Sequence, residues 1–319
     1  MNRKRKIIIE NNQVSEVCMV KLGGYDQKIL IEGKSDKLPV VITLHGGPGT
    51  PIPFCVGGRG MFPDFTDKCI LVSWDQFGCG INNAELPEDI SIDDFVLMTE
   101  ELIEVIKNKF PNNQLYLFGM SWGSILSAKA AINKAELVSG VIVYGQVLFD
   151  LMQSDETITA LMNSNAPQKV KNEIQSVMKS KRFDFKASMK LSKYVRKYTY
   201  GYNNPNEQKS PIGKMIMGIL ASPDYKFSDF IAIIKNGYLK NRSLITELSK
   251  VDLRDVLSKV EIPYHIIQGE TDIVTCTACI KKFVENAGNP NLRCTVIKDA
   301  AHLPGMNSMN AILNEISFL

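Results

Sequence analysis

The chain has 319 residues, of which 45% are hydrophobic and 22% are charged, and its formal net charge is +3. This composition supplies a large buried core, argues against wholesale disorder, and gives no indication of nucleic-acid binding. No apolar run approaches the roughly 20 residues that span a bilayer, and the basic residues 3–6 precede only three isoleucines, too few for a signal peptide. We therefore expect a soluble, cytoplasmic protein with no membrane or nucleic-acid partner.

The first half of the chain alternates between strand-like and helix-like patterns. Three segments that alternate like strands are followed by two continuous apolar runs of the kind found in strands buried on both faces, at residues 6–10, 14–21, 28–32, 38–44 and 69–74. A helix, a strand, a second helix and another buried strand are then predicted at 91–109, 114–118, 121–134 and 138–144. Such alternation is typical of a parallel sheet with helices on both faces.

The pattern changes near residue 148, where the chain becomes rich in Lys and Met. Only helices are predicted there, at 155–162, 166–178, 187–198, 211–221 and 226–248. Alternation then resumes with a strand, a helix, a strand and a final helix at 262–268, 276–286, 292–297 and 304–318. We therefore expect an α/β core in two segments, 1–147 and 249–319, with a helical insertion at 148–248 lying over it.

A G-x-S-x-G pattern at residues 119–123 lies between a predicted strand and a predicted helix. A turn this tight strains the backbone of its central residue, and the small side chains of Gly119 and Gly123 relieve the crowding. Ser121 then stands at a helix N-terminus, where the local dipole favours developing negative charge. The pattern indicates Ser121 as a catalytic nucleophile.

The sequence HGGPG at residues 45–49 directly follows a buried strand. A glycine-rich loop lets backbone N–H groups approach a substrate closely, and no Gly-Lys-Ser/Thr follows to indicate a phosphate-binding loop. We expect the N–H groups of Gly47 and Trp122 to form an oxyanion hole, because Trp122 comes directly after the nucleophile. His45 is expected to have a structural role in fixing this loop.

The general base is sought among the three histidines of the chain. His45 belongs to the loop, and His265 lies inside the predicted strand 262–268, where we expect it to be packed. His302 lies between the last strand and the last helix, at the sheet edge where ligands bind in open α/β folds. His302 is therefore the expected base.

The acid that orients the base should follow the preceding core strand. Asp272 does so, and its carboxylate would hold the correct tautomer of His302. Glu270 and Asp150 are the alternatives. The order Ser121, Asp272, His302 is that of the α/β-hydrolase triad, so a serine hydrolase is predicted.

Seven cysteines are scattered along the chain, an odd number that weighs against a secreted disulfide framework. Cys276 and Cys279 form one CxxC, without the second pair or the histidines that a zinc site needs. We expect structural thiols, no metal and no cofactor.

Three segments together resemble the proline iminopeptidase group of α/β-hydrolases, the serine aminopeptidases. They are HGGPG, the WDQFGCG of residues 74–80 and the GMSWGS of residues 119–124. The resemblance implies the α/β-hydrolase fold, with a mostly parallel central sheet, helices on both faces and an inserted helical cap, which matches the segment 148–248. It also implies release of an N-terminal residue, such as proline, from small peptides.

Two departures from that group concern the substrate. Phe77 and Asn82 stand where the group has Arg and Ser, and the insertion lacks the Trp-Glu pair with which some members hold a free amino terminus. Four acids are candidates for substrate binding in its place: Glu173, Glu207, Asp224 and Asp229. The segment 169–197 holds ten Lys or Arg against two acids, which indicates either a solvated helical face or a cap that attracts an anionic substrate.

Three functions follow from these observations. The first is a peptidase that acts on short peptides through an acyl group on Ser121. The second is an esterase, thioesterase or lactonase that uses the same triad on a small acyl substrate. The third is a non-catalytic α/β-hydrolase scaffold that binds a ligand or partner. The oligomeric state is left open.

Overall fold

The fold is built on one eight-stranded sheet, which the computed structural model shows within its described residues, 1–149, 151–180 and 185–317. The strand order is β1-β2-β4-β3-β5-β6-β7-β8. The strands are β1 (Val14–Leu22), β2 (Tyr25–Gly33), β3 (Val40–Leu44), β4 (Ile70–Trp74), β5 (Leu115–Met120), β6 (Gly140–Tyr144), β7 (Tyr264–Gly269) and β8 (Leu292–Ile297). Strands β1, β2 and β4 pair antiparallel, and every pair from β4 to β8 is parallel.

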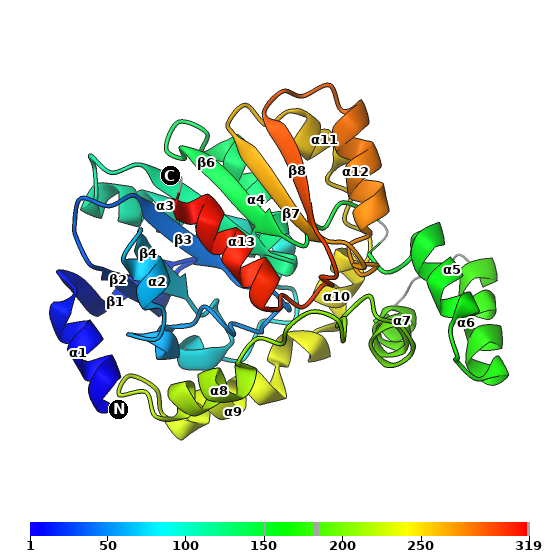
Figure 1. Cartoon of the computed structure of the whole chain (residues 1–319), viewed down its shortest axis with the longest axis horizontal. Coiled ribbons are helices and arrows are strands. Elements are labelled where there is room, and N and C mark those ends of the chain that lie inside the picture. Colours follow the sequence, from blue (N-terminus) through cyan, green and yellow to red (C-terminus); the bar gives the residue numbers. More distant parts are fainter. Residues whose placement is uncertain (150, 181–184, 318–319) are drawn as a thin grey trace.

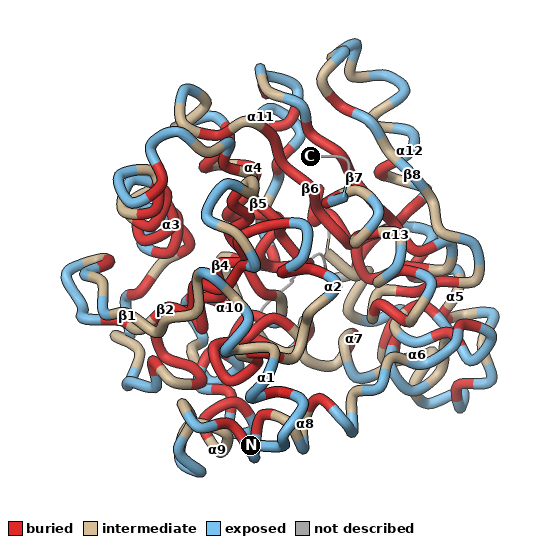
Figure 2. The backbone as a smooth tube through the Cα atoms, turned by 60° about the vertical axis from the view of Figure 1, so that its left-hand side comes forward, coloured by how far each residue is buried: buried red, intermediate tan, exposed pale blue. Residues whose placement is uncertain are grey.

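Helices cover both faces of this sheet (Figure 1). One face packs against α3 (Ile92–Lys109), α4 (Trp122–Asn133), α11 (Arg254–Ser258) and α12 (Thr277–Asn286). The other packs against α2 (Pro63–Thr66) and α13 (Met306–Ser317). The strands that were predicted as continuous apolar runs, β3 and β4, are buried along their whole length because both faces are covered. Figure 2 shows this burial for β4.

The chain between β6 and β7 forms a series of helices. They are α5 (Asp155–Asn163), α6 (Gln168–Ser180), α7 (Phe185–Tyr198), α8 (Ile212–Leu220), α9 (Phe227–Lys235), the 3-10 helix η3 (Gly237–Lys240), α10 (Arg242–Leu248) and then α11. Helices α5, α6 and α7 lie to one side of the sheet (Figure 1) and share an apolar cluster of Leu161, Ile174, Leu191 and Val195. The segment boundaries at 147/148 and 248/249 remain our proposal.

The strand predicted for residues 6–10 is wrong, because these residues lie in helix α1 (Arg3–Asn11). The Asn2 side chain caps the helix by accepting from the Arg5 N–H at 2.8 Å. The buried Arg5 guanidinium donates to the carbonyls of Gly57 at 2.6 Å and Gly218 at 2.7 Å. These contacts with distant residues override the β preference of three consecutive isoleucines.

The single helix predicted for 226–248 is also wrong, because Asn236 interrupts it between α9 and η3. Asn236 adopts a left-handed backbone conformation with a φ of 39°. Its side chain donates to the Pro48 carbonyl at 3.0 Å, so the break fixes a contact with the glycine loop. Four short elements were not predicted: η1 (Val56–Gly58), α2, η2 (Gly80–Asn82) and α11.

Within the described residues, no helix combines the length and the apolar character needed to cross a membrane.

Candidate active site

The turn between β5 and α4 holds Ser121 in a sharp strand-to-helix bend. Its φ of 49° and ψ of −113° form a conformation that residues other than glycine rarely adopt. The Ser121 N–H donates to the Tyr144 carbonyl at 2.9 Å, and the Ser124 hydroxyl donates to the Ser121 carbonyl at 2.6 Å. These bonds fix the bend at the carboxyl end of the sheet.

The two glycines of the G-x-S-x-G pattern are required by close packing. A Cβ on Gly123 would lie 1.9 Å from the Leu44 carbonyl oxygen. A Cβ on Gly119 would lie 2.4 Å from the Ser127 hydroxyl oxygen and 2.7 Å from the Gly123 carbonyl oxygen. Helix α4 can approach the sheet this closely only without these side chains.

The structure brings His302 to Ser121 from the far end of the chain, in the loop between β8 and α13. Its Nε2 lies 2.9 Å from the Ser121 Oγ, and its Nδ1 lies 2.8 Å from the Asp272 Oδ2. The His302 N–H donates to the Gly201 carbonyl at 3.1 Å, so the insertion helps to hold this loop. Ser121, His302 and Asp272 therefore form one hydrogen-bonded chain.

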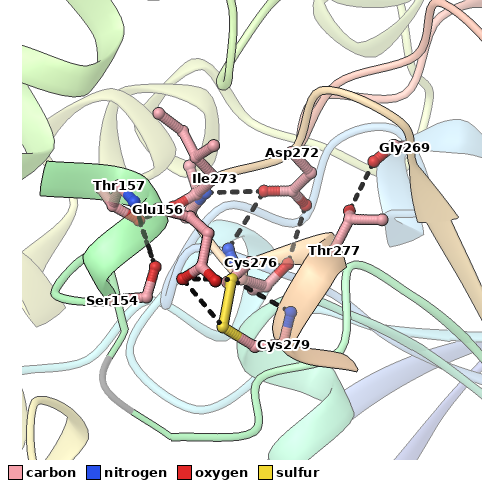
Figure 3. Close-up of a disulfide and its surroundings, with 11 residues drawn as sticks. Ser154, Glu156, Thr157, Gly269, Asp272, Ile273, Cys276, Thr277 and Cys279 are labelled. Carbon is pink, nitrogen blue, oxygen red and sulfur yellow. Dashed lines mark hydrogen bonds between the residues drawn. A yellow bond between two sulfur atoms is a disulfide. The ribbon is translucent and has the colours of Figure 1, made fainter. Parts of the chain in front are cut away.

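Asp272 is 1% exposed and its carboxylate is surrounded by donors. The Oδ1 accepts the N–H groups of Val274 at 2.7 Å and Thr275 at 3.0 Å, and the Oδ2 accepts the Thr275 hydroxyl at 2.7 Å (Figure 3). These bonds, with that from His302, hold an acceptor carboxylate in a fixed orientation.

The two alternative acids are placed differently. Glu270 accepts the N–H of Asp299 at 3.0 Å, whereas the carboxylate that reaches His302 is that of Asp272. Asp150 lies outside the described residues.

The loop of residues 45–49 passes beside Ser121. A Cβ on Gly46 would lie 3.4 Å from the Ser121 Cβ. Within the described parts of the chain, neither the N–H of Gly47 nor that of Trp122 has a hydrogen-bond acceptor. Both N–H groups are thus without an acceptor in this part of the structure.

Gln76 links this loop to the nucleophile helix, a role that the sequence analysis missed. The Trp122 indole donates to the Gln76 Oε1 at 2.8 Å, and the Gln76 side-chain amide donates to the His45 carbonyl at 3.3 Å. The only signal in the sequence was its place in the segment 74–80.

His45 is buried and holds the loop with both of its ring nitrogens. Its Nε2 accepts the Gln76 N–H at 3.0 Å, and its Nδ1–H donates to the Gly46 carbonyl at 3.0 Å. Burial lowers the pKa of His45 to about 4, so the ring is neutral near pH 7. His265 lies elsewhere, with its Nε2 2.8 Å from the Thr295 hydroxyl.

The segment in which the chain departs from the iminopeptidase group has its own contacts. Phe77 stacks on Tyr25 with ring centroids 4.1 Å apart. The Asn82 side chain donates to the carbonyls of Lys28 at 2.8 Å and Asp75 at 2.6 Å. Both residues thus stabilise the segment that carries Gln76.

A cavity of about 360 Å³ opens at Ser121 and His302. Its lining is mostly apolar and comes largely from the chain between β6 and β7. The other lining residues are Gly47, Pro48, Leu151, Met152, Ser188, Met189, Ser192, Lys193, Val195, Arg196, Tyr202, Leu239, Ile245, Leu248, Ser249 and Val274. The Arg196 guanidinium stacks on the Tyr202 ring at 4.0 Å, and the Tyr202 and His302 ring centroids are 6.0 Å apart.

None of the four acids suggested by the sequence lines this cavity: Glu173, Glu207, Asp224 and Asp229. Glu173 accepts from the Lys190 ammonium at 2.9 Å and the Tyr194 hydroxyl at 2.7 Å, and these bonds lower its pKa. Glu207 accepts from the hydroxyl and the N–H of Ser308, at 2.8 and 3.1 Å.

The other two acids are also engaged outside the cavity. Asp224 forms an ion pair with Arg59 at 3.4 Å. Asp229 accepts the Lys226 N–H at 2.9 Å at the start of α9. None of the four acids therefore faces the cavity at Ser121.

Cys276 and Cys279 are joined by a disulfide at the start of α12. The Glu156 Oε2 lies 3.5 Å from each sulfur (Figure 3). Within the described residues these three form the one group of possible metal ligands. Since the two sulfurs are bonded to each other, they are not available as thiolate ligands.

The comparisons with known proteins agree with this fold. The chain belongs to the α/β-hydrolase fold family, whose sequence model matches residues 39–308. It is 21% identical to "Probable aminopeptidase YbaC" of Bacillus subtilis (strain 168) over 98% of both chains. It is 27% identical to "Proline iminopeptidase" of Thermoplasma volcanium over 74% of each.

A solved structure supports the same fold. The crystal structure of VinJ superposes with a TM-score of 0.64 and 18% identity over 94% of this chain and 96% of that one. The predicted fold class and the resemblance to proline iminopeptidases are both confirmed, the latter as a distant relationship.

Proposed function

We propose that this chain is a serine hydrolase that cleaves an acyl bond through a covalent intermediate on Ser121. The proposal is carried by the hydrogen-bonded chain Ser121–His302–Asp272, whose two distances are 2.9 and 2.8 Å. Nucleophile, base and orienting acid are within hydrogen-bond reach, and Ser121 and His302 line one cavity.

The proposed reaction begins when the Ser121 oxygen attacks the substrate carbonyl and its proton passes to the His302 Nε2. Asp272 holds the Nδ1–H and stabilises the imidazolium that forms. His302 then protonates the leaving group, and the acyl group stays on Ser121. Water, deprotonated by the same nitrogen, releases the acid and restores the serine.

The tetrahedral oxyanion is assigned to the free N–H groups of Gly47 and Trp122. Each such donor is worth about 3–4 kcal/mol of transition-state stabilisation. The Gln76 side chain bonds to both the His45 carbonyl and the Trp122 indole. It would thereby hold the N–H groups of Gly47 and Trp122 at a fixed distance from each other.

Hydrolysis of 4-nitrophenyl hexanoate by the wild type and by Ser121→Ala tests the proposal. We expect turnover by the wild type and a loss of at least about 10³-fold in the variant. Equal rates for the two proteins would contradict a serine mechanism and favour a ligand-binding scaffold.

The relatives favour a second candidate, an aminopeptidase that releases an N-terminal proline. A free amino terminus is a cation and needs an acceptor or a carboxylate near it. The described lining of the cavity contains no Asp or Glu. We therefore place the hydrolysis of esters or thioesters first.

Proline 4-nitroanilide assayed beside 4-nitrophenyl hexanoate separates the two candidates. Ester turnover without detectable release of nitroaniline would support the first. A higher kcat/KM on the proline anilide would establish the aminopeptidase.

A further inference from the structure

The charged side chains in the cavity lining all have the same sign. Within the described lining, Lys193 and Arg196 are the only Lys or Arg residues, and there is no Asp or Glu. Both residues are exposed, whereas Ser121 and His302 are half-buried.

Helix α7 presents these two cations toward the cavity and packs through its other side. The spacing i, i+3 puts Lys193 and Arg196 on one face, while Leu191 is buried in the cluster shared with α5 and α6. Among the described residues neither cation forms an ion pair. The nearby Glu173 is occupied by Lys190.

Apolar side chains line the same cavity as Ser121 and the two cations. Nine apolar side chains belong to the described lining: Pro48, Leu151, Met152, Met189, Val195, Leu239, Ile245, Leu248 and Val274. A ligand in this cavity would thus meet Ser121, apolar side chains and two cations.

We propose that the substrate is an acyl compound with an apolar segment next to the scissile carbonyl and an anionic group, carboxylate or phosphate, bound by Lys193 and Arg196. This inference rests on the proposed function and names its substrate class. Two cations that form no ion pair among the described residues attract an anion and repel a protonated amine.

A matched pair of esters tests the inference for a carboxylate on the acyl group. The mono-4-nitrophenyl ester of adipic acid and 4-nitrophenyl hexanoate have acyl chains of equal length and differ in the terminal carboxylate. We expect a higher kcat/KM for the adipate ester in low salt, and a preference that shrinks as salt rises.

The double variant Lys193→Met/Arg196→Met should lower kcat/KM for the adipate ester by roughly tenfold, as two exposed charge contacts allow. The loss of kcat/KM on the hexanoate ester should be clearly smaller than the loss on the adipate ester. Lys186→Met removes an exposed charge from the same helix outside the lining, and it should leave the preference unchanged. Because Arg196 also stacks on Tyr202, an equal loss on both esters would indicate a positioning role and overturn the inference.

A second pair tests a phosphate on the leaving group: hexanoyl-coenzyme A against the hexanoyl thioester of N-acetylcysteamine. A preference for the coenzyme A thioester that is lost in the double variant would assign the cations to phosphate. No preference in either pair, with the neutral esters hydrolysed through Ser121, would overturn the inference and leave the proposed function intact. No turnover of any ester or thioester would overturn both.

Discussion

The side chain of Asn236 donates a hydrogen bond to the Pro48 carbonyl at 3.0 Å and thereby joins the chain between β6 and β7 to the glycine loop. A Cβ on Gly49 would lie 2.5 Å from the Asn236 Oδ1, so the two segments are in close contact. The position of the Gly47 N–H therefore depends on a residue far along the chain.

Replacing Asn236 tests this dependence. Asn236→Gly keeps the left-handed backbone and removes the side-chain bond to the Pro48 carbonyl and the longer one, at 3.4 Å, to the Thr50 hydroxyl. The loss of the shorter bond alone, about 1 kcal/mol, should lower kcat about fivefold and change KM little. Asn133→Gly, at the exposed end of α4, lacks such a contact with the loop and serves as the control. An unchanged kcat in Asn236→Gly would show that the position of the glycine loop does not depend on the Asn236 side chain.

A second prediction concerns Gly123, where helix α4 approaches β3. Gly123→Ala forces a Cβ to within 1.9 Å of a backbone carbonyl, so we expect a destabilisation of about 3 kcal/mol or failure to fold. Gly213→Ala in α8 meets no atom within 4 Å and should be neutral or slightly stabilising. Urea unfolding of both variants measures this difference. Equal midpoints would show that α4 can move away from the sheet.

Much of this fold was predictable because its signals are local. The apolar runs at 38–44 and 69–74 became β3 and β4, and the G-x-S-x-G turn lies where β5 meets α4. Helix α1 was missed because a distant set of carbonyls binds Arg5, which no nearby pattern reveals.

The catalytic candidates could be predicted from local sequence signals, whereas the residues that line the cavity could not. Ser121, Asp272 and His302 each follow a core strand, and the sheet brings such positions to one edge. The cavity is formed by helices whose packing depends on tertiary contacts. The sequence does not show which faces of these helices point inward. None of the four candidate acids lines the cavity.

A third prediction uses the depressed pKa of His45. Burial lowers this pKa from 6.5 to about 4, so the unfolded chain binds more protons between these values. The stability that the neutral His45 provides is complete above pH 6.5 and is lost as the pH falls toward 4. Moving from pH 7 to pH 5 should cost the wild type about 2 kcal/mol through this group.

His45→Gln removes the titration and should lose about 2 kcal/mol less than the wild type over that interval. The loss of stability must be compared between the two proteins, because burial also raises the pKa of Asp75 to about 7. Asp75 therefore makes the free energy of unfolding rise as the pH falls, which is opposite to the effect of His45. Urea unfolding at the two pH values provides it. Parallel losses in both proteins would show that His45 is solvated.

A fourth prediction concerns the disulfide between Cys276 and Cys279. A cross-link over so short a loop contributes about 2 kcal/mol by chain entropy. Cys276→Ser/Cys279→Ser should lower the free energy of unfolding by that amount while kcat stays within about twofold, since neither sulfur contacts Asp272. Cys18→Ser, a change at a free thiol, is the control. A large loss of kcat in the double variant would contradict this and would indicate that the disulfide helps to hold Asp272 in place.

The reactivity of Ser121 decides the central claim most directly. The protein is treated with a fluorophosphonate, digested and mapped by mass spectrometry, with His302→Gln treated in parallel. We expect one adduct, on the peptide that contains Ser121, formed by the wild type and at least about 10³-fold more slowly by the variant. An adduct on another serine, or none where a control hydrolase is labelled, would contradict it.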